Sequence, residues 1–270
     1  MPVKWENLTS DGLKAWVEKS KKTVVLPVSI IEKHGHHLPL GTDAMINRVI
    51  LDKAETLQPF VIAPEVVFGQ GCETKNGQGT IAIRGDVMLA LLENICDELY
   101  RNGFDKIVIA DGHGGNGQGL PFFTQAMMTK EKPYLVYYVN TWYITDEEEK
   151  YINEKYGEDD DPGHADRDET SLVMAYDESL VRMDLYQPDE PHYFPGVEWI
   201  HENRIFTPAH WPVSRKTHVT GRPDLASREL GEALTNIHAR HLARQVRLIQ
   251  DDEKLMQDYR NFLSAGHFEG

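Results

Sequence analysis

Residues 106–116 read Lys-Ile-Val-Ile-Ala-Asp-Gly-His-Gly-Gly-Asn, and this stretch decides the fold. Positions 107–110 are apolar without alternation, which is typical of a parallel strand that is buried on both faces. Gly112, Gly114 and Gly115 predict a sharp turn directly after this strand. Positions 116–130 then have apolar residues at helical spacing, so the sequence predicts one strand–turn–helix unit of a parallel sheet.

The same alternation continues on both sides of this unit. We predict strands near 23–30, 60–67, 80–84, 105–110 and 134–140, and helices over 43–57, 86–102 and 116–130, with Asp43 and Asp86 as N-caps. Acidic runs follow at 146–149 and 158–161, and they favour a solvated loop or helix face. Beyond them we expect a helix at 168–176, an irregular segment at 186–218 and a long helix at 223–250. Because no linker is evident, residues 1–270 are expected to form a single α/β domain with helices on both faces of the sheet.

The composition restricts the partners. The chain carries 43 Asp and Glu against 28 Lys and Arg, a formal net charge of -15. This charge repels phosphate backbones and anionic membranes, so we expect neither nucleic acid nor a membrane as a partner. The first ten residues contain no apolar signal segment, which favours a cytoplasmic location. Cys72 and Cys96 are too few for a thiolate site, so a metal would need nitrogen and oxygen ligands.

Polar side chains gather where two predicted strands end. Glu32 and His34 follow the first strand and point to the same side, because side chains alternate along an extended chain. His113 follows the strand at 105–110, and the carboxyl ends of parallel strands form one ligand-binding edge. Asp43 opens the next helix, where it is either a further ligand or only an N-cap. A lone His113 would more often be a structural turn histidine, but its convergence with these side chains favours a site.

A third polar cluster begins at His164. Asp168 and Glu169 lie at the start of a predicted helix, where the helix dipole alone would account for them but not for His164. Two histidines and three carboxylates form a ligand set that suits Zn²⁺ or Mn²⁺, with Fe²⁺ also compatible. One bridging carboxylate can hold two such ions about 3.5–4 Å apart. The sequence therefore predicts a divalent metal centre, with two ions per subunit.

Positions 32–43 read Glu-x-His-Gly-x-His-Leu-Pro-x-Gly-Thr-Asp and resemble the opening signature of the creatinine amidohydrolase (creatininase) family. Further stretches similar to motifs of that family follow in the same order: Gly79-Thr80-Ile81, residues 111–116, His164-Ala165, Glu169-Thr170-Ser171 and Thr220-Gly221. The resemblance implies a three-layer α/β/α sandwich with a mainly parallel sheet and a metal-dependent hydrolase activity. It also implies a homohexamer, since members of the family usually assemble in this way.

The resemblance also implies roles for individual residues. It gives four metal ligands: Glu32, His34, Asp43 and His113. It makes Asp43 the bridge between two ions and His164 the residue that transfers a proton. Creatinine-hydrolysing members have His-Tyr-Glu-Asn where this chain has His-Gly-Gly-Asn at 113–116. Other branches are similar to this chain in having the glycines and are expected to use the glutamate of Glu-Thr-Ser, which makes Glu169 the fifth ligand.

Three residues are assigned to substrate binding: His37, Glu73 and Trp142. His37 belongs to the opening motif, and Glu73 lies in a loop where relatives have a Glu-His pair and this chain has Glu-Thr. Trp142 follows the last predicted strand, where it either walls the pocket or packs in the core. Cys72, in the same loop as Glu73, is expected to be a small packed residue rather than a nucleophile.

Creatinine itself is not the expected substrate, because this chain has Gly114 and acidic residues 160–161 where creatinine hydrolases enclose the ring with aromatic side chains. We expect activated water to attack the carbonyl of another small cyclic or linear amide, at a C–N bond that is not a peptide bond. Two alternatives stay open: ring opening of a keto-inositol or oxidised sugar, and a non-catalytic relative that only binds metal. The absence of a Gly-x-Ser-x-Gly motif argues against a serine nucleophile.

Overall fold

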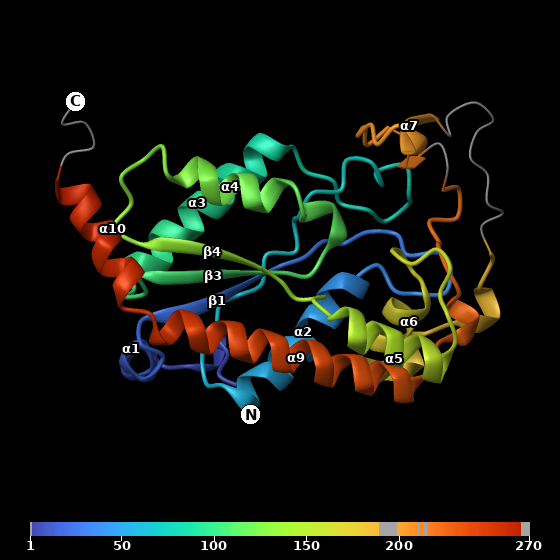
Figure 1. Cartoon of the computed structure of the whole chain (residues 1–270), viewed down its shortest axis with the longest axis horizontal. Coiled ribbons are helices and arrows are strands. Elements are labelled where there is room, and N and C mark those ends of the chain that lie inside the picture. The colour runs from blue at the N-terminus through green and yellow to red at the C-terminus, as the bar shows by residue number, and fades with distance from the viewer. Residues whose placement is uncertain (1, 189–198, 210, 213–214, 266–270) are drawn as a thin grey trace.

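The computed structural model describes residues 2–188, 199–209, 211–212 and 215–265. Within these ranges a parallel sheet of four strands has the order β2-β1-β3-β4. Its strands are β1 (Thr23–Val28), β2 (Val61–Ile62), β3 (Lys106–Asp111) and β4 (Leu135–Asn140). Helices α3 and α4 cover one face and α2 and α9 the other, so the predicted three-layer α/β/α arrangement is confirmed (Figure 1).

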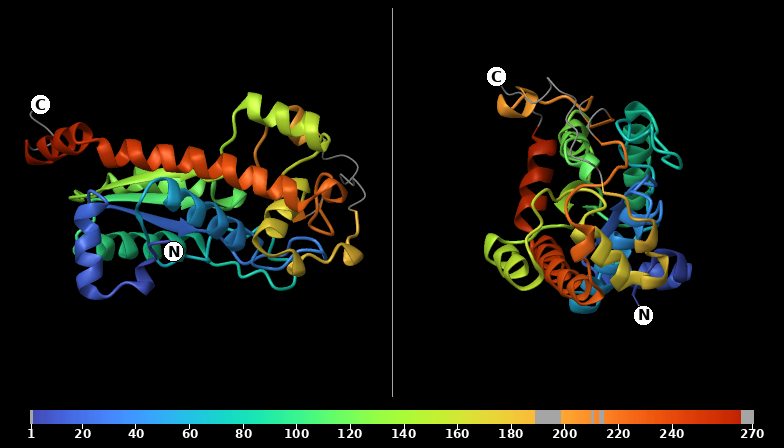
Figure 2. Two further views of the ribbon diagram at one scale, coloured as in Figure 1. Left: turned by 90° about the horizontal axis from the view of Figure 1, so that it is seen from below. Right: turned by 90° about the vertical axis from the view of Figure 1, so that its right-hand side faces the viewer.

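The helices alternate with the strands in the first half of the chain and follow one another in the second. Their bounds are α1 (Ser10–Lys19), α2 (Thr42–Leu57), α3 (Gly85–Arg101), α4 (Gly119–Met127), α5 (Asp146–Tyr156), α6 (Arg167–Asp177), α7 (Trp199–Glu202), α9 (Arg228–Asp251) and α10 (Lys254–Ser264). Figure 2 shows α9 lying along the sheet, with α5 beside it. Within the described ranges, no helix combines the length and the apolarity that crossing a bilayer requires.

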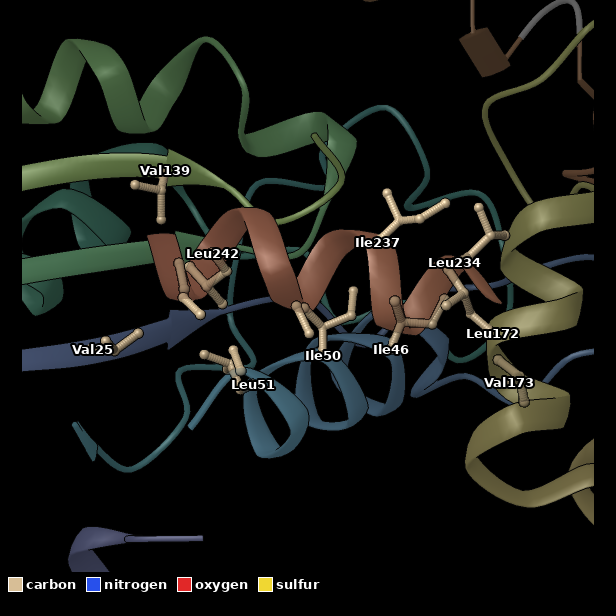
Figure 3. Packing of buried hydrophobic residues seen from close by; sticks show 14 of the residues in the cluster. Val25, Ile46, Ile50, Leu51, Val139, Leu172, Val173, Leu234, Ile237 and Leu242 are labelled. Atoms are coloured by element: carbon tan, nitrogen blue, oxygen red, sulfur yellow. The ribbon is translucent and has the colours of Figure 1, made fainter. Parts of the chain in front are cut away.

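The strands are apolar because both of their faces are buried. All six residues of β1 are buried, and Val24 and Leu26 pack on the side of α3 with Leu92. Val25 points to the other side, into the cluster formed with α2, α6 and α9 (Figure 3). The burial of each such side chain contributes about 1.5–3 kcal/mol, so the two clusters fix the sheet between its helices.

Two of the predicted strands differ in the structure. The predicted strand at 80–84 is wrong: this segment contains no strand, and a backbone hydrogen bond joins Ile81 to Ile31. Gly79 has a φ of +97°, which turns the chain at that point, and Ile81 is 45% exposed. The strand predicted at 60–67 shortens to β2, with an isolated bridge at Val66.

Several helices begin at residues other than the predicted ones. Asp86 is not the N-cap of α3, which is Arg84, and the predicted helix at 223–250 starts only at Arg228 with Ser227 as its N-cap. The first acidic run is a helix face rather than a loop, since it opens α5 with a capping box between Thr145 and Glu148. Part of the predicted irregular segment at 186–218 lies outside the described residues.

Gly231 is a point of close approach between α9 and α6. A Cβ at this position would lie 1.8 Å from the backbone carbonyl oxygen of Ser171, so α6 would have to move. We expect Gly231→Ala to lower the free energy of unfolding by about 1–3 kcal/mol, because overpacking outweighs the roughly 1 kcal/mol that alanine gains in a helix. Urea denaturation measures this. The control is Gly85→Ala, where a Cβ meets nothing within 4 Å and stability should not fall. Unchanged stability of the Gly231 variant would contradict this packing.

Candidate metal centre

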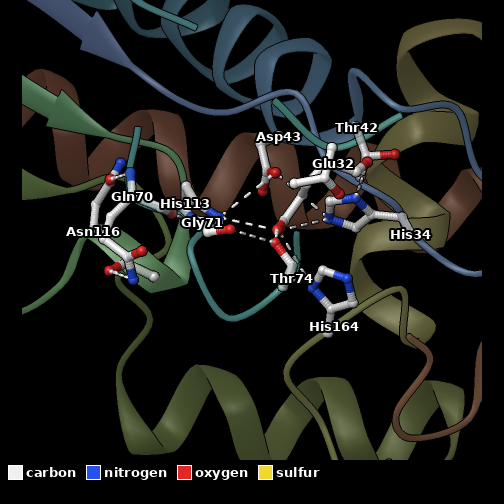
Figure 4. A network of polar contacts seen from close by, with 12 residues as sticks. Glu32, His34, Thr42, Asp43, Gln70, Gly71, Thr74, His113, Asn116 and His164 are labelled. Atoms are coloured by element: carbon white, nitrogen blue, oxygen red, sulfur yellow. Dashed lines mark hydrogen bonds and ion pairs between the residues drawn. The ribbon is translucent and has the colours of Figure 1, made fainter. Parts of the chain in front are cut away.

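Five predicted ligands converge in one buried cluster. Figure 4 shows Glu32, His34, Asp43 and His113 among them. The Oδ2 atom of Asp43 lies 3.6 Å from Nε2 of His34 and 3.6 Å from Nδ1 of His113. His34 Nε2 is also 3.4 Å from Oε2 of Glu169. His113 Nδ1 is 3.4 Å from Oε1 of Glu32. The loops after β1 and β3 and the first turns of α2 and α6 therefore meet at the carboxyl edge of the sheet.

The loop at 69–81 holds Glu32 from the side. The hydroxyl of Thr74 donates a hydrogen bond of 2.6 Å to Oε2 of Glu32, which leaves Oε1 directed at the cluster. The backbone N–H of Lys33 donates to the hydroxyl of Thr80, so the segment between Glu32 and His34 is fixed at the same time.

Asp43 is not the N-cap of α2, and that alternative is wrong. The N-cap is Gly41, and the helix begins at Thr42. The carboxylate of Asp43 therefore lies in the first turn and points into the cluster instead of closing the helix end. One turn later, Asn47 donates a hydrogen bond of 3.2 Å to the carbonyl of Ala110, which docks α2 against β3.

His113 is positioned by a network at the end of β3. The Oδ1 atom of Asp111 accepts hydrogen bonds from the backbone N–H of His113 at 3.1 Å and from Asn116 at 3.0 Å. The side-chain oxygen of Asn116 accepts from the N–H of Gln70 at 2.8 Å, and the Gln70 carbonyl lies 2.7 Å from His113 Nε2. The motif at 111–116 thus fixes both the backbone and the ring of His113.

The Thr220-Gly221 pair holds His164. The N–H of His164 donates to the Thr220 hydroxyl at 2.8 Å, and the N–H of Thr220 donates to the His164 carbonyl at 2.8 Å. Ala165 has a φ of +53°, which is strained for a residue with a Cβ, and its N–H donates to Oε2 of Glu169 at 2.5 Å. The strained backbone therefore aims His164 and Glu169 at the same centre.

The three histidines share one arrangement of their ring nitrogens. In His34, His113 and His164, one ring nitrogen lies 2.7–3.2 Å from a backbone carbonyl oxygen. A carbonyl only accepts, so that nitrogen carries the hydrogen, and the other nitrogen of a neutral ring offers a lone pair to the cluster. This is the tautomer that metal-binding histidines adopt when an outer acceptor fixes the ring.

The residues fit a divalent cation. Among the described residues, three atoms of the cluster are buried without a hydrogen-bond partner: Glu32 Oε1, His34 Nε2 and Asp43 Oδ2. Buried polar atoms are rarely left without partners, and here all three face one another. Three overlapping groups of ligand atoms lie within 4.8 Å: Glu32–His34–His164, Glu32–Asp43–His113 and His34–Asp43–Glu169.

The electrostatics agree with this fit. Burial, reinforced by the nearby Asp43 carboxylate, raises the pKa of Glu169 well above its usual range. Burial also raises the pKa of Asp43 and lowers that of His34. Burial opposes the charged form of His113 too, but the carboxylates of Glu32 and Asp43 outweigh it and raise the pKa of His113 to about 10. In the metal-free site Nδ1 of His113 therefore carries a proton, which a bound cation would displace. Carboxylates packed this closely repel one another, and a cation between them relieves that repulsion.

A cavity of about 220 Å³ opens over the cluster, and Glu73 lies in its wall. Trp211 also lines it, with its ring 5.3 Å from that of His164 in an edge-on arrangement. Trp211 could not be identified from the sequence by spacing, because a tryptophan in an irregular segment has no spacing relation to the ligands. The only available signal was the length and aromatic content of that segment.

Two predicted substrate-binding residues lie outside the lining of this cavity. Nε2 of His37 is 3.1 Å from the hydroxyl of Thr170, and burial lowers the pKa of His37 to about 4. Trp142 packs against the hydrophobic cluster that β1 forms with α2, α6 and α9, and its ring lies 6.4 Å from that of His238. Their assignment to substrate binding stays a prediction, whereas Glu73 lies next to the ligands.

The comparisons with known proteins identify the family of the chain. A family model described as creatinine amidohydrolase matches residues 6–246. The creatinine amidohydrolase of Pseudomonas putida is 24% identical over 254 residues, which cover 89% of this chain and 94% of that protein. The 3-dehydro-scyllo-inosose hydrolase of Thermotoga maritima is 22% identical over 202 residues, which cover 74% of this chain and 64% of that protein.

The solved structures give the same fold. A crystal structure of a Bacteroides fragilis protein assigned to the creatinine amidohydrolases has a TM-score of 0.80 at 25% identity, over 93% of this chain and 98% of that one. Creatininase structures with a TM-score of 0.72 and 21% identity include a manganese form and a Zn-Zn form of a mutant.

Proposed function

The chain belongs to the creatininase family of hydrolytic enzymes, and on that premise we propose that it hydrolyses a small cyclic or linear amide, at a C–N bond other than a peptide bond, with a divalent metal. The observation that carries the proposal is the set of buried, unpartnered atoms of Glu32, His34 and Asp43, which face one another beside two further predicted ligands. Buried polar atoms are normally paired, so an unpartnered set of this kind supports a bound cation.

Five residues would hold the metal: Glu32, His34, Asp43, His113 and Glu169. Asp43 Oδ2 is equidistant from His34 and His113, at 3.6 Å, which supports a bridging role between two ions. Nitrogen and carboxylate ligands suit Zn²⁺ or Mn²⁺, and Fe²⁺ is compatible with them. When bound, the metal polarises a carbonyl group and activates water near neutral pH.

His164 supplies the proton transfer in this proposal. Its Nε2 lies 2.8 Å from the carbonyl of Lys33, so in the neutral ring Nδ1 is the acceptor that faces the cavity. Nδ1 takes a proton from the attacking water and gives it to the departing amine nitrogen. Trp211 lies edge-on to His164 in the wall of the same cavity, with the ring centres 5.3 Å apart.

The second candidate is hydrolytic ring opening of a keto-inositol or oxidised sugar by the same residues. Similarity to the Thermotoga maritima inosose hydrolase favours it, since that relative matches 74% of this chain. The third is a relative that binds metal without turnover.

We also propose a small-molecule substrate, one domain over residues 1–270, a homohexamer and a cytoplasmic location, which rest on the sequence alone.

The test combines metal analysis with a substrate panel. We expect protein purified without chelator, then incubated with Mn²⁺ or Zn²⁺, to retain metal after gel filtration and to hydrolyse a member of a panel of cyclic amides and formamides. Activity should disappear with a chelator and return with the metal. Turnover confined to keto-inositols would favour the second candidate, and bound metal without any turnover the third. Protein that retains no metal would contradict all three.

A further inference from the structure

A second cavity continues the metal-site cavity. It has a volume of about 570 Å³, against about 220 Å³ for the cavity over the ligands. Glu73, Gly114 and Gly115 line both, so the two share a wall and form an inner and an outer chamber. The inner chamber suits a small amide group, and the outer chamber has room for a longer substituent.

The outer chamber is mainly apolar. Its apolar wall consists of Phe206, Pro208, Ala209 and Pro212, from the segment that follows α7 at the carboxyl end of the sheet (Figure 1). Phe206 is 66% exposed and lies in this wall. Among the described lining residues there is no lysine or arginine, and the carboxylate present is Glu73. This lining favours a neutral apolar group over a phosphate or carboxylate.

The two glycines between the chambers have different roles. A Cβ at Gly115 would lie 2.5 Å from Nε2 of His113 and 3.0 Å from the Gln70 carbonyl, so the contact between these two groups requires glycine there. A Cβ at Gly114 would meet nothing within 4 Å. The missing side chain of Gly114 therefore leaves space along the wall that the chambers share, and we take this space as the passage between them.

The two chambers also define a direction for the substrate. His164, Gly163 and Trp211 line only the inner chamber, on the side where the leaving amine takes its proton. The outer chamber is lined by Gly114, the chain neighbour of His113, and His164 does not line it. An amide carbonyl over the ligands thus has its nitrogen toward His164 and its acyl substituent toward the outer chamber.

We propose that the substrate is an amide whose acyl side carries an extended, neutral apolar group that occupies the outer chamber. This inference rests on the proposed amide hydrolysis. In the reaction, water adds to the carbonyl carbon and gives one proton to His164, the C–N bond breaks, and the amine leaves with that proton. The acyl part leaves as a carboxylate after releasing the second proton of the water to solvent.

Two substrate series test the direction with metal-loaded wild-type enzyme. One is a set of anilides whose acyl chain grows from propanoyl to hexanoyl, and the other keeps propanoyl and lengthens an N-alkyl group. We expect kcat/KM to rise about fourfold per methylene in the acyl series and to stay flat in the amine series. A rise only with the amine chain, or no rise in either series, would overturn the proposal.

Variants of Gly114 test the passage. Gly114→Phe should reduce the hexanoyl-to-propanoyl ratio of kcat/KM to near one, because the ring fills the space between the chambers. Gly114→Ala is the matched control and should keep the wild-type ratio, since its Cβ has open space. A wild-type ratio in the Phe variant would overturn the assignment of this passage.

Cys72 provides a readout that does not depend on turnover. The prediction of a packed residue is wrong for Cys72, which is exposed and lines the outer chamber, whereas Cys96 is buried and serves as the internal reference. Hexanoyl anilide, but not propanoyl anilide, should slow the alkylation of Cys72 by iodoacetamide, as measured by peptide mass spectrometry. Protection without hydrolysis of either series would refute the proposed function and leave the chamber assignment standing. Hydrolysis without protection would refute the chamber assignment alone.

Discussion

Asp43→Asn should abolish metal binding without destabilising the metal-free protein. The wild-type protein at a metal concentration about 100 times its Kd should gain about 2.7 kcal/mol of stability, a rise in Tm of roughly 5–10 °C for a chain of this size. The variant should lose this rise, because Asp43 Oδ2 lies between His34 and His113 and no other described carboxylate is equidistant from both rings. Thermal unfolding with and without Mn²⁺ measures the effect.

The metal-free comparison separates a ligand from a structural residue. Burial is the largest influence on the pKa of Asp43, so a neutral amide of the same shape removes the cost of burying a charge. We therefore expect the variant in EDTA to be at least as stable as the wild type. Turnover of the best amide in the panel should fall by at least about 100-fold, more than the loss of an outer-shell partner typically costs.

Asp86→Asn is the matched control. Asp86 is the second residue of α3, as Asp43 is of α2, but its side chain is 71% exposed and pairs with Arg84. An exposed pair of this kind contributes about 0–1 kcal/mol, so its loss should leave the metal response intact. Wild-type metal occupancy in the Asp43 variant would contradict the assignment of Asp43 as a ligand.

His164→Ala should lower kcat by about 10²–10⁴-fold while the protein keeps its metal. The ring of His164 stacks on that of His34 at 4.1 Å, and its Nδ1 lies 3.7 Å from Glu32 Oε1, so it borders the centre. The five assigned ligands remain in the variant, which is why metal content should persist. Steady-state kinetics together with metal analysis of the same sample measures both effects.

The control for His164 is His36→Ala. His36 belongs to the opening motif but is exposed, so its removal should change neither metal content nor kcat. If the His164 variant instead lost metal and turnover in parallel, His164 would be a ligand, in line with its position in one of the three ligand groups. Unchanged kcat with full metal occupancy would remove its proposed role in proton transfer.

Much of the candidate site could be predicted from the sequence because all strands of a parallel sheet end at the same edge. Glu32 and His34 come directly after β1, and His113 comes directly after β3. Since neighbouring parallel strands end at the same edge, residues about 80 positions apart in the chain had to lie close together. The apolar run in β3 indicated that both of its faces are covered, which predicted helices on each side.

Other features could not be predicted from the sequence because they depend on contacts between distant segments. The strand predicted at 80–84 has suitable residues but no neighbouring strand to pair with, and extended chain becomes a strand only when its backbone groups are paired. Trp211 reaches the cavity only through the path of the segment after α7. Neither periodicity nor capping preference carries information about such a path.

By itself, the sequence determined the alternation of strands and helices from β1 to β4, apart from the segment at 80–84, and the types of polar side chain at the edge of the sheet, because these depend on periods of two to four residues and on composition. Only the tertiary structure decided that Asp43 faces the metal centre instead of capping α2, which nitrogen of each histidine is available, and that a second chamber adjoins the site. These features arise where loops from different strands meet, and the energies of those contacts have no local signature in the chain.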